Sequence, residues 1–376
     1  MEYKIAVILN NFAPQDMPFL CGIRAYQLNF IFSLSKNFLV DVYCTNTTQT
    51  SFEGINNISL INPNAPLDKA FFEAKGYDGV VDFSDNNYTS PSFLTIGLKH
   101  NYSPIFQNHL KSNFINKIFS YFKKSKNDHK ITTFAEKMAT FDILFLSSQN
   151  LKKDYIQNTT LQEENIIILN PCLTTLKDFN IKNLENTPFT FAIDFRNISY
   201  FKKLNFMFAI AKLKKEQYDF KIKIINPNYK KDILMKTLLF FGLSQNIEFV
   251  GYQDKMNIFW EEINCFINLN TSPFNFSVLE AMNSSIPCIS NDIDGTSDII
   301  KENENGWLLQ QKHLNTQSLY TKMKFILNNQ KDYPKISENA YKTACKLSLE
   351  NHSSKLFEIL KIKIESNKNQ DCENNP

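Results

Sequence analysis

Residues 272–309 read SPFNFSVLEAMNSSIPCISNDIDGTSDIIKENENGWLL, and this stretch decides the fold that we expect for the second half of the chain. It opens as an apolar-rich helix that carries one carboxylate, Glu280, and continues as a short strand, a glycine turn and a second small helix. The apolar run at 265–269 supplies a strand directly before it. Strands that alternate with helices in this way predict a parallel sheet covered by helices.

The same alternation extends in both directions from this stretch. In the second half, strands are expected at 189–195, 220–225, 247–250 and 265–269, with helices at 204–215 and 231–241. In the first half, a helix at 22–36 separates the first two strands, and the expected strands are 3–9, 40–43, 79–83, 105–107, 143–146 and 166–169. Short, continuous apolar runs are typical of strands buried on both faces. The pattern predicts two Rossmann-like, doubly wound parallel sheets.

The length of 376 residues also favours two domains, because single hydrophobic cores stop growing well below this size. The polar segment KNLENTP at 182–188 is the expected linker between them. We therefore predict an N-terminal domain at 1–181 and a C-terminal domain at 189–345. A helical segment at 346–366 is expected to pack back on the N-terminal domain, and the polar residues 367–376 are expected to be disordered.

Composition excludes several classes of function. The balance of 41 Lys and Arg against 38 Asp and Glu argues against a nucleic-acid partner, whose phosphates would require clustered positive charge. The seven cysteines are scattered without a Cys-x-x-Cys pair, which predicts reduced thiols in a cytosol and no zinc site. No apolar run reaches the roughly 18 residues of a membrane span. We expect a cytoplasmic protein that is soluble or peripheral to a membrane.

The stretch around Glu280, together with IPCISNDIDGTSDII and NGWLL in register after it, resembles the donor-binding signature of retaining GT-B glycosyltransferases of family 4. In that family, two glutamates eight positions apart hold the two halves of a nucleotide sugar. The chain carries Ser272 at the first position and Glu280 at the second. The resemblance implies an α/β GT-B fold, with an acceptor-side N-terminal domain and a donor-side C-terminal domain facing each other across a cleft. It also implies a nucleotide diphosphate sugar as donor, retention of configuration, and no metal or other cofactor.

Around Glu280, the residue types fit the nucleotide half of such a site. Its carboxylate can accept hydrogen bonds from two ribose hydroxyls, while the backbone N–H groups of Asn275, Phe276 and Ser277 at the start of the helix can meet a pyrophosphate. The alternative is a surface glutamate on an amphipathic helix. Ser272 cannot replace a carboxylate, and a lost charged partner costs about 1.5 to 3 kcal/mol. Sugar selection is therefore expected to differ from the family, with the amide of Asn275 as a substitute contact.

Basic residues follow the strand at 189–195. Arg196 and either Lys202 or Lys203 can clamp a pyrophosphate and stabilise the charge that develops as the glycosidic bond breaks. The resembled family has Gly-Arg and Lys-Gly at this place, whereas this chain has Phe195 and Leu204 at the two glycine positions. The sequence leaves open which lysine faces the phosphates, and solvated basic residues on a loop remain the alternative.

Three further features belong to the first half of the chain. His109 follows a short strand at the place where the family carries a histidine that lines the sugar side of the cleft, although a structural histidine is equally consistent. Gly22 stands where a glycine loop opens the first helix of the family. Residues 114–130 combine an apolar helical face with several lysines, which suits either an anionic lipid surface or an ordinary core-facing helix.

Taken together, these residues predict a glycosyltransferase that moves a sugar from a nucleotide diphosphate donor to a glycan or lipid-linked acceptor. Bacterial surface polysaccharide or lipooligosaccharide synthesis is the expected setting, with peripheral contact to the inner membrane. One alternative is a catalytically weak GT-B protein that acts as a binding or scaffold partner of another transferase. A sugar-nucleotide epimerase-like enzyme or a phosphorylase is the other.

Overall fold

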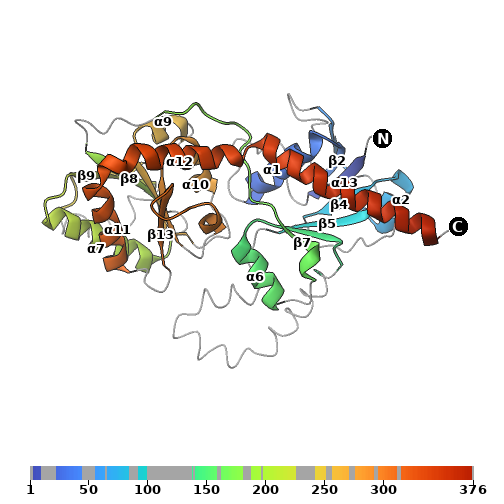
Figure 1. Cartoon of the computed structure of the whole chain (residues 1–376), viewed down its shortest axis with the longest axis horizontal. Coiled ribbons are helices and arrows are strands. Elements are labelled where there is room, and N and C mark those ends of the chain that lie inside the picture. Colours follow the sequence, from blue (N-terminus) through green and yellow to red (C-terminus); the bar gives the residue numbers. More distant parts are fainter. Residues whose placement is uncertain are drawn as a thin grey trace. The chain divides into compact units, whose positions relative to one another are not determined.

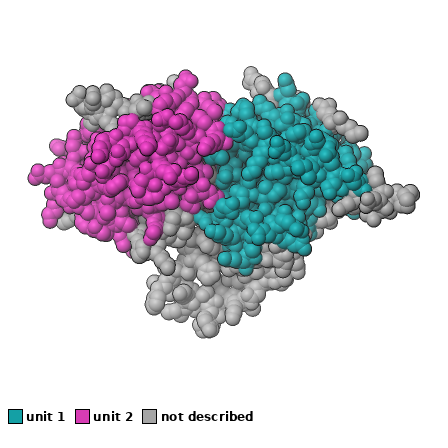
Figure 2. All heavy atoms as spheres, in the orientation of Figure 1, with its two compact units in different colours: residues 1–174, 347–376 teal, residues 175–346 magenta. Residues whose placement is uncertain are grey.

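A computed structural model describes most of the chain. The described residues are 3–9, 23–44, 56–63, 66–83, 92–99, 138, 140–158, 162–180, 188–195, 198–225, 242–250, 256–270, 276–291, 295–310 and 315–374. They form two compact units, one of Met1–Thr174 with Leu347–Pro376 and one of Thr175–Lys346 (Figure 2). The chain therefore leaves unit 1 after Thr174, earlier than the linker predicted at 182–188, and returns to it after Lys346.

Unit 1 is built on a seven-stranded parallel sheet with the strand order β3-β2-β1-β4-β5-β6-β7. Its strands are β1 (Lys4–Leu9), β2 (Leu39–Cys44), β3 (Ile58–Ile61), β4 (Gly79–Asp82), β5 (Leu94–Lys99), β6 (Ile143–Leu146) and β7 (Ile166–Ile168). Its helices are α1 (Ile23–Ser35), α2 (Lys69–Lys75), α6 (Gln149–Asn158), α13 (Leu349–Asn374) and the short 3₁₀ turn η3 (Glu163–Asn165). β4, β5 and β6 are buried along their whole length, as is typical of the central strands of a parallel sheet, and the sequence of β6 is apolar throughout.

Unit 2 is built on a six-stranded parallel sheet with the order β10-β9-β8-β11-β12-β13; β8, β9 and β13 of this sheet are labelled in Figure 1. Its strands are β8 (Phe189–Asp194), β9 (Phe220–Ile225), β10 (Ile247–Val250), β11 (Cys265–Asn268), β12 (Cys288–Asn291) and β13 (Gly306–Leu309). Its helices are α7 (Tyr200–Lys215), α9 (Met256–Glu261), α10 (Phe276–Asn283), α11 (Thr316–Asn328), α12 (Tyr333–Lys346) and the 3₁₀ turns η5 (Gly295–Asp298) and η7 (Gln330–Asp332). Both units are thus doubly wound α/β domains, and the predicted fold class is confirmed.

The sequence predicts some elements to the residue and misses others. β6, β9 and β10 have the predicted bounds: β6 is a continuous apolar run, whereas β9 and β10 place apolar residues on both sides of charged ones. β3 and β5 were not predicted: β3 has only four residues, one of them exposed, and β5 contains Thr95 and Gly97 within its apolar run. The strand predicted at 105–107 and the helix predicted at 231–241 lie outside the described residues.

The C-terminal segment differs from the prediction. The sequence predicts helix only to residue 366 and a disordered tail at 367–376, but α13 continues to Asn374. It is anchored to unit 1 along its length. Tyr3 Oη donates to Glu365 Oε1 at 2.9 Å, and Lys368 Nζ lies 2.5 Å from Asp78 Oδ1. These polar contacts explain why a sequence with few apolar residues near its end remains helical, since tertiary contacts override local propensity.

A buried polar cluster joins α13 to α1 within unit 1. Ser33 Oγ donates to the carbonyl of Asn29 at 2.8 Å and lies 2.7 Å from His352 Nδ1 and 3.8 Å from Cys172 Sγ. Because the serine proton is used by Asn29, Nδ1 of His352 carries the proton and donates to Ser33. Nε2 is buried and has no hydrogen-bond partner among the described residues. Burial, helped by the nearby charge of Lys355, lowers the pKa of His352 from 6.5 to about 4.

Gly306 at the start of β13 is required by a close approach of backbones in unit 2. A Cβ at this position would lie 2.7 Å from the carbonyl oxygen of Cys288 on the neighbouring strand. The carbonyl belongs to the sheet ladder between β12 and β13, so it cannot move aside without breaking their pairing. The glycine of the NGWLL segment is therefore explained by strand packing in addition to its place in a signature.

We expect Gly306→Ala to destabilise unit 2 by about 1 to 3 kcal/mol, the usual cost of overpacking a well-packed core. Both tryptophans of the chain, Trp260 and Trp307, belong to unit 2, so urea unfolding followed by tryptophan fluorescence reports on this unit. Gly79→Ala in unit 1 is the matched control, because the nearest atoms there are the ends of the Ile5 and Ile96 side chains. Equal shifts of the urea midpoint, read from tryptophan fluorescence for Gly306→Ala and from far-UV circular dichroism for Gly79→Ala, would contradict this explanation.

We expect the stability of unit 1 to fall as the pH is lowered from about 6.5 towards 4. His352 has a lower pKa in the folded chain than in the unfolded chain, so the unfolded state binds more protons in this interval and is favoured by acid. The effect amounts to at most about 3 kcal/mol. Hydrogen exchange of α1 and α13 measures it, with His352→Asn as the variant that keeps a donor to Ser33 but does not titrate. Parallel pH profiles for wild type and variant would rule out His352 as the cause.

Candidate functional site

The topology of unit 2 selects one edge of its sheet. β8 lies at the centre of the strand order, with β9 on one side and β11 on the other, so the chain connections run in opposite directions from it. In open α/β sheets, ligands bind outside the carboxyl ends of the strands at such a switch point. The candidate site is therefore the carboxyl edge of β8, β11 and β12, which we call the switch-point edge.

Lys202 spans this edge. It lies in the first turn of α7, the helix that follows β8, and its Nζ donates to the carbonyl oxygen of Leu269 at 2.7 Å. Leu269 is fully buried and directly follows β11. The bond thus joins the two strands that flank the switch point and holds a positive charge between them.

Lys203 lies at the same end of α7 but makes a different contact. Its Nζ lies 5.3 Å from the centre of the Phe195 ring, which is buried and directly follows β8. An ammonium at this distance from an aromatic face gains a cation–π attraction of about 0.5 to 1 kcal/mol. The two lysines therefore occupy the two sides of the edge, Lys202 towards β11 and Lys203 towards β8.

The start of α7 is electrostatically suited to an anion. The N-cap residue, Ser199, makes no capping hydrogen bond with its side chain, and the first turn contains no acidic residue. The positive end of the helix dipole is instead joined by the two lysine ammonium groups, an arrangement that costs about 0.3 to 1 kcal/mol for each charge. A bound anion offsets this repulsion and can also accept hydrogen bonds from the first backbone N–H groups of the helix.

A buried polar network lies along the switch-point edge. Asn268 Nδ2 donates to Ser290 Oγ at 2.9 Å, and Ser290 Oγ lies 2.7 Å from Thr296 Oγ1. Asn291 Nδ2 donates to the carbonyl of Asn270 at 2.8 Å. These bonds tie β11, β12 and η5 together, so the edge is rigid.

The network also contains two amide oxygens without partners. Oδ1 of Asn270 and Oδ1 of Asn291 are both buried and accept no hydrogen bond within the described part of the chain. Sequence reasoning did not select either residue. The sequence does mark both places with polar residues at the end of an apolar strand. Asn268-Leu-Asn270 begins at the last residue of β11, and Ser290-Asn291 ends β12.

Glu280 is the exposed residue of an otherwise buried helix. α10 begins at Phe276, as predicted, and Val278, Leu279, Ala281 and Met282 on it are fully buried. Glu280 is exposed, four positions after the first helical residue. The carboxylate is thus accessible to a ligand, and the buried side chains fix the helix that carries it.

Three of the other predicted site residues can also be placed. Phe276 and Ser277 form the first turn of α10 and are half-buried, and Lys203 lies at the switch-point edge together with Lys202. Five predicted residues lie outside the described part of the chain: Gly22, His109, Arg196, Ser272 and Asn275. The amphipathic segment predicted at 114–130 also lies outside it.

Two cysteines of this sheet, at the amino ends of β11 and β12, have no nucleophilic role. Cys265 on β11 and Cys288 on β12 are fully buried, and burial raises the pKa of both thiols far above the usual range. They remain protonated at neutral pH, and a thiol without its thiolate is a poor nucleophile. The sheet supplies a rigid frame here, and the chemistry available at the edge is that of the lysines, the amides and the exposed carboxylate.

The described residues contain neither a metal cluster nor a membrane-spanning helix. Among them, no three His, Cys, Asp or Glu side chains are grouped so that they could hold a metal ion. No helix in the same set is both long and apolar enough to cross a membrane.

Comparison with known structures shows the fold. A glycosyltransferase from Rickettsia africae superimposes with a TM-score of 0.68 at 15% identity, over 96% of this chain and 98% of that chain. Anabaena HepE, solved in complex with UDP and glucose, gives 0.66 at 14% identity over 96% and 100%. The lipopolysaccharide outer core galactosyltransferase WaaB gives 0.66 at 14% identity over 96% and 99%. These similarities extend over both units, and they identify the two-domain GT-B fold.

Comparison of sequences finds a similarity that covers most of unit 2. No curated protein sequence matches the chain. The family model described as glycosyl transferases group 1 matches residues 183–343, which contain the whole six-stranded sheet, the switch-point edge and Glu280. The chain thus has the GT-B fold, and residues 183–343 of its unit 2 are similar to the glycosyl transferases group 1 family.

Proposed function

We propose that the protein transfers a sugar from a nucleotide diphosphate donor to a glycan or lipid-linked acceptor, with retention of configuration. The observation that carries this proposal is the switch-point edge within the matched domain, where Lys202 is held between the ends of β8 and β11 by its bond to Leu269. Such a position suits the diphosphate of the donor, because the edge combines positive charge with the free N–H groups of a helix start.

The proposed sugar transfer depends more on stabilising the charge of the leaving diphosphate than on a protein nucleophile. When the glycosidic bond of the donor breaks, negative charge grows on the diphosphate. Preorganised cations and backbone N–H groups at that place lower the barrier because they are positioned before the reaction begins. Lys202 and Lys203 supply the cations, and Arg196, the residue after Phe195, is proposed to add a bidentate contact. In this proposal no metal ion or other cofactor is needed.

Glu280 is assigned to the nucleotide half of the donor. An exposed carboxylate on a fixed helix can accept hydrogen bonds from two neighbouring ribose hydroxyls. Phe276 and Ser277, at the start of the same helix, are assigned to the phosphates. The sugar half is assigned to Ser272 and Asn275, whose neutral side chains select the sugar without a carboxylate.

The setting of the reaction is proposed from the structural relatives. HepE was solved with UDP and with UDP-glucose, and WaaB is described as a galactosyltransferase of the lipopolysaccharide outer core. By analogy, the acceptor of this protein is a bacterial surface glycan or its lipid-linked precursor. The proposal places the protein in the cytoplasm, in peripheral contact with the inner membrane where such an acceptor is presented.

The proposal is tested by incubating the full chain with UDP-, GDP- and CDP-sugars and a glycolipid acceptor. Transfer to the acceptor, with the anomeric configuration of the product read by NMR, is the expected result. A thermal-shift screen against the free nucleotide diphosphates identifies the base first, because a ligand at about 100 times its Kd stabilises by about 2.7 kcal/mol. Neither transfer nor donor hydrolysis with any sugar would argue against a transferase.

We expect Glu280→Ala to weaken binding of the nucleotide diphosphate by about ten- to hundredfold, the usual cost of removing a charged hydrogen-bonding partner. Isothermal titration calorimetry measures the change. Glu261→Ala, another exposed glutamate of unit 2 but on α9, is the matched control and should bind as wild type does. Equal affinities for all three proteins would remove Glu280 from the site.

We expect Lys202→Ala and Lys203→Ala to lower kcat by about a hundredfold while changing nucleotide affinity less, because charge on the leaving diphosphate is largest in the transition state. Steady-state kinetics with the donor identified by the screen separates kcat from KM. Lys215→Ala, at the other end of α7, controls for the loss of a helix lysine. A variant of Lys202 that turned over like the Lys215 variant would contradict the assigned role.

A further inference from the structure

A separate cavity lies at the opposite edge of the unit 2 sheet. It has a volume of about 230 Å³, and its lining includes Phe189, the first residue of β8, and Trp307, near the start of β13. Because all strands of this sheet are parallel, their amino ends lie at the edge opposite the switch-point edge. Neither Lys202 nor Glu280 contributes to the lining. The cavity is therefore distinct from the site assigned to the donor.

The floor of this cavity is apolar and mainly aromatic. Phe189, Trp307, Tyr333 and Ile326 line it, and each of these side chains is less than 4% exposed. Phe325 also lines it but is 43% exposed. Phe325 is therefore the ring that is open to a ligand, and the nearly buried side chains fix the shape of the floor. Such a floor suits a small ring with an apolar face.

Amide groups surround the floor in fixed orientations. Asn329, Gln330 and Asn339 all line the cavity, and each donates an amide N–H to a backbone carbonyl, at 2.7, 3.2 and 3.0 Å respectively. These bonds hold the plane of each amide. The three side-chain carbonyl oxygens accept no hydrogen bond from the residues that the structure describes. The rim thus presents preorganised acceptors rather than donors.

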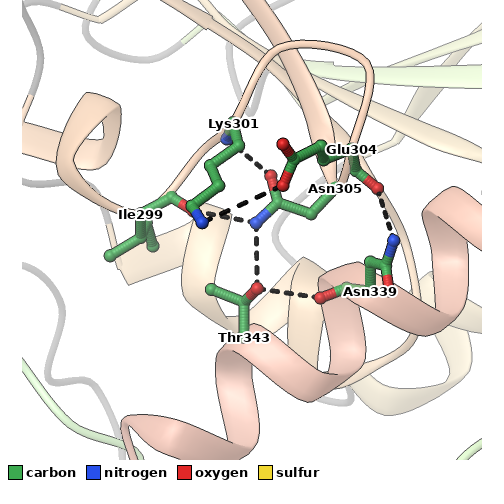
Figure 3. A network of polar contacts seen from close by, with 6 residues as sticks. All are labelled: Ile299, Lys301, Glu304, Asn305, Asn339 and Thr343. Carbon is green, nitrogen blue, oxygen red and sulfur yellow. Dashed lines mark hydrogen bonds and ion pairs between the residues drawn. The ribbon is translucent and has the colours of Figure 1, made fainter.

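The wall formed by the loop at 299–305 is held in place against α12 (Figure 3). Asn305 Nδ2 donates to Thr343 Oγ1 at 2.9 Å, and Asn339 Nδ2 donates to the carbonyl of Glu304 at 3.0 Å. The loop and the helix therefore keep a constant separation on this side of the cavity. A ligand that enters does not have to order this wall, which lowers the free-energy cost of binding.

The charges of the lining exclude an anionic ligand. Glu304 and Asp332 carry negative charge and Lys335 carries positive charge, so the lining has one net negative charge. The indole Nε1 of Trp307 and the hydroxyl of Tyr333 are buried and have no hydrogen-bond partner among the described residues, so the cavity offers these two donors beside the Lys335 ammonium. A ligand that matches this set is uncharged, has an apolar ring face and carries several hydroxyl donors.

We propose that this cavity binds one neutral sugar residue of a glycan, with its ring against Phe325 and its hydroxyls donating to the amide oxygens. This second site is independent of the donor site, because it uses no residue assigned to the donor. It lies within the same unit, so a glycan bound there would be retained on the protein between encounters with the switch-point edge.

The indole N–H signals of the full chain test the proposal directly. The chain has two tryptophans, so a nitrogen-15-labelled sample gives two indole cross-peaks, of which the one from Trp307 is assigned by its loss in Trp307→Phe. Titration with methyl glucoside, methyl galactoside and methyl N-acetylglucosaminide should shift the Trp307 peak and leave the Trp260 peak in place. Absence of any shift at saturating concentrations of all three glycosides would overturn the proposal.

Matched variants locate the sugar. Asn329→Ala and Phe325→Ala are expected to weaken binding of the methyl glycoside about fivefold or more, since each removes one of the assigned contacts. Lys331→Ala is the control, because Lys331 is exposed and next to Gln330 but does not line the cavity. Unchanged binding in the first two variants, or tighter binding of the anionic methyl glucuronide than of methyl glucoside, would refute the assignment.

Discussion

The parallel pairing of β8 with β11 is the constraint on which the rest of unit 2 depends. Phe191, Ala192 and Ile193 pair with Cys265, Phe266 and Ile267, although more than seventy residues separate them along the chain. A parallel pair needs crossover connections, so every helix between these strands must pack on a face of the sheet. The pairing also brings the start of α7 beside the end of β11, and the bond from Lys202 to Leu269 is the direct result.

The two edges of this sheet have opposite characters because parallel strands all point the same way. At the carboxyl edge, Asn268, Ser290 and Asn291 form hydrogen bonds among themselves and with their neighbours, and the two lysines of α7 add positive charge. At the amino edge, neutral amide side chains surround an aromatic floor, and Glu304, Asp332 and Lys335 give the lining one net negative charge. A diphosphate fits the first edge and a neutral sugar fits the second, so the charge distribution of one domain separates the two proposed ligands.

The lysines at the two ends of α7 have opposite effects on the stability of the helix. Lys212, Lys214 and Lys215 lie in the last turn, where positive charge is favourable to the helix dipole. Lys202 and Lys203 lie in the first turn, where the same charge is unfavourable. A helix selected for stability alone would carry acidic residues there. A bound anion would offset the unfavourable charge of Lys202 and Lys203. The diphosphate of the proposed donor is such an anion.

What the sequence alone determined was local: the alternation of apolar runs with helices, hence two parallel doubly wound sheets, and the positions of Lys202 and Lys203 in the helix after β8 and of Glu280 in the helix after β11. Hydrophobic periodicity and short motifs specify these features because they depend on neighbours along the chain. Only the tertiary structure decided the strand order, the contact between Lys202 and Leu269, the continuation of α13 to Asn374 and the cavity under Trp307. These depend on contacts between residues far apart in the chain, 67 positions in the case of Lys202 and Leu269, and no local pattern encodes such pairs.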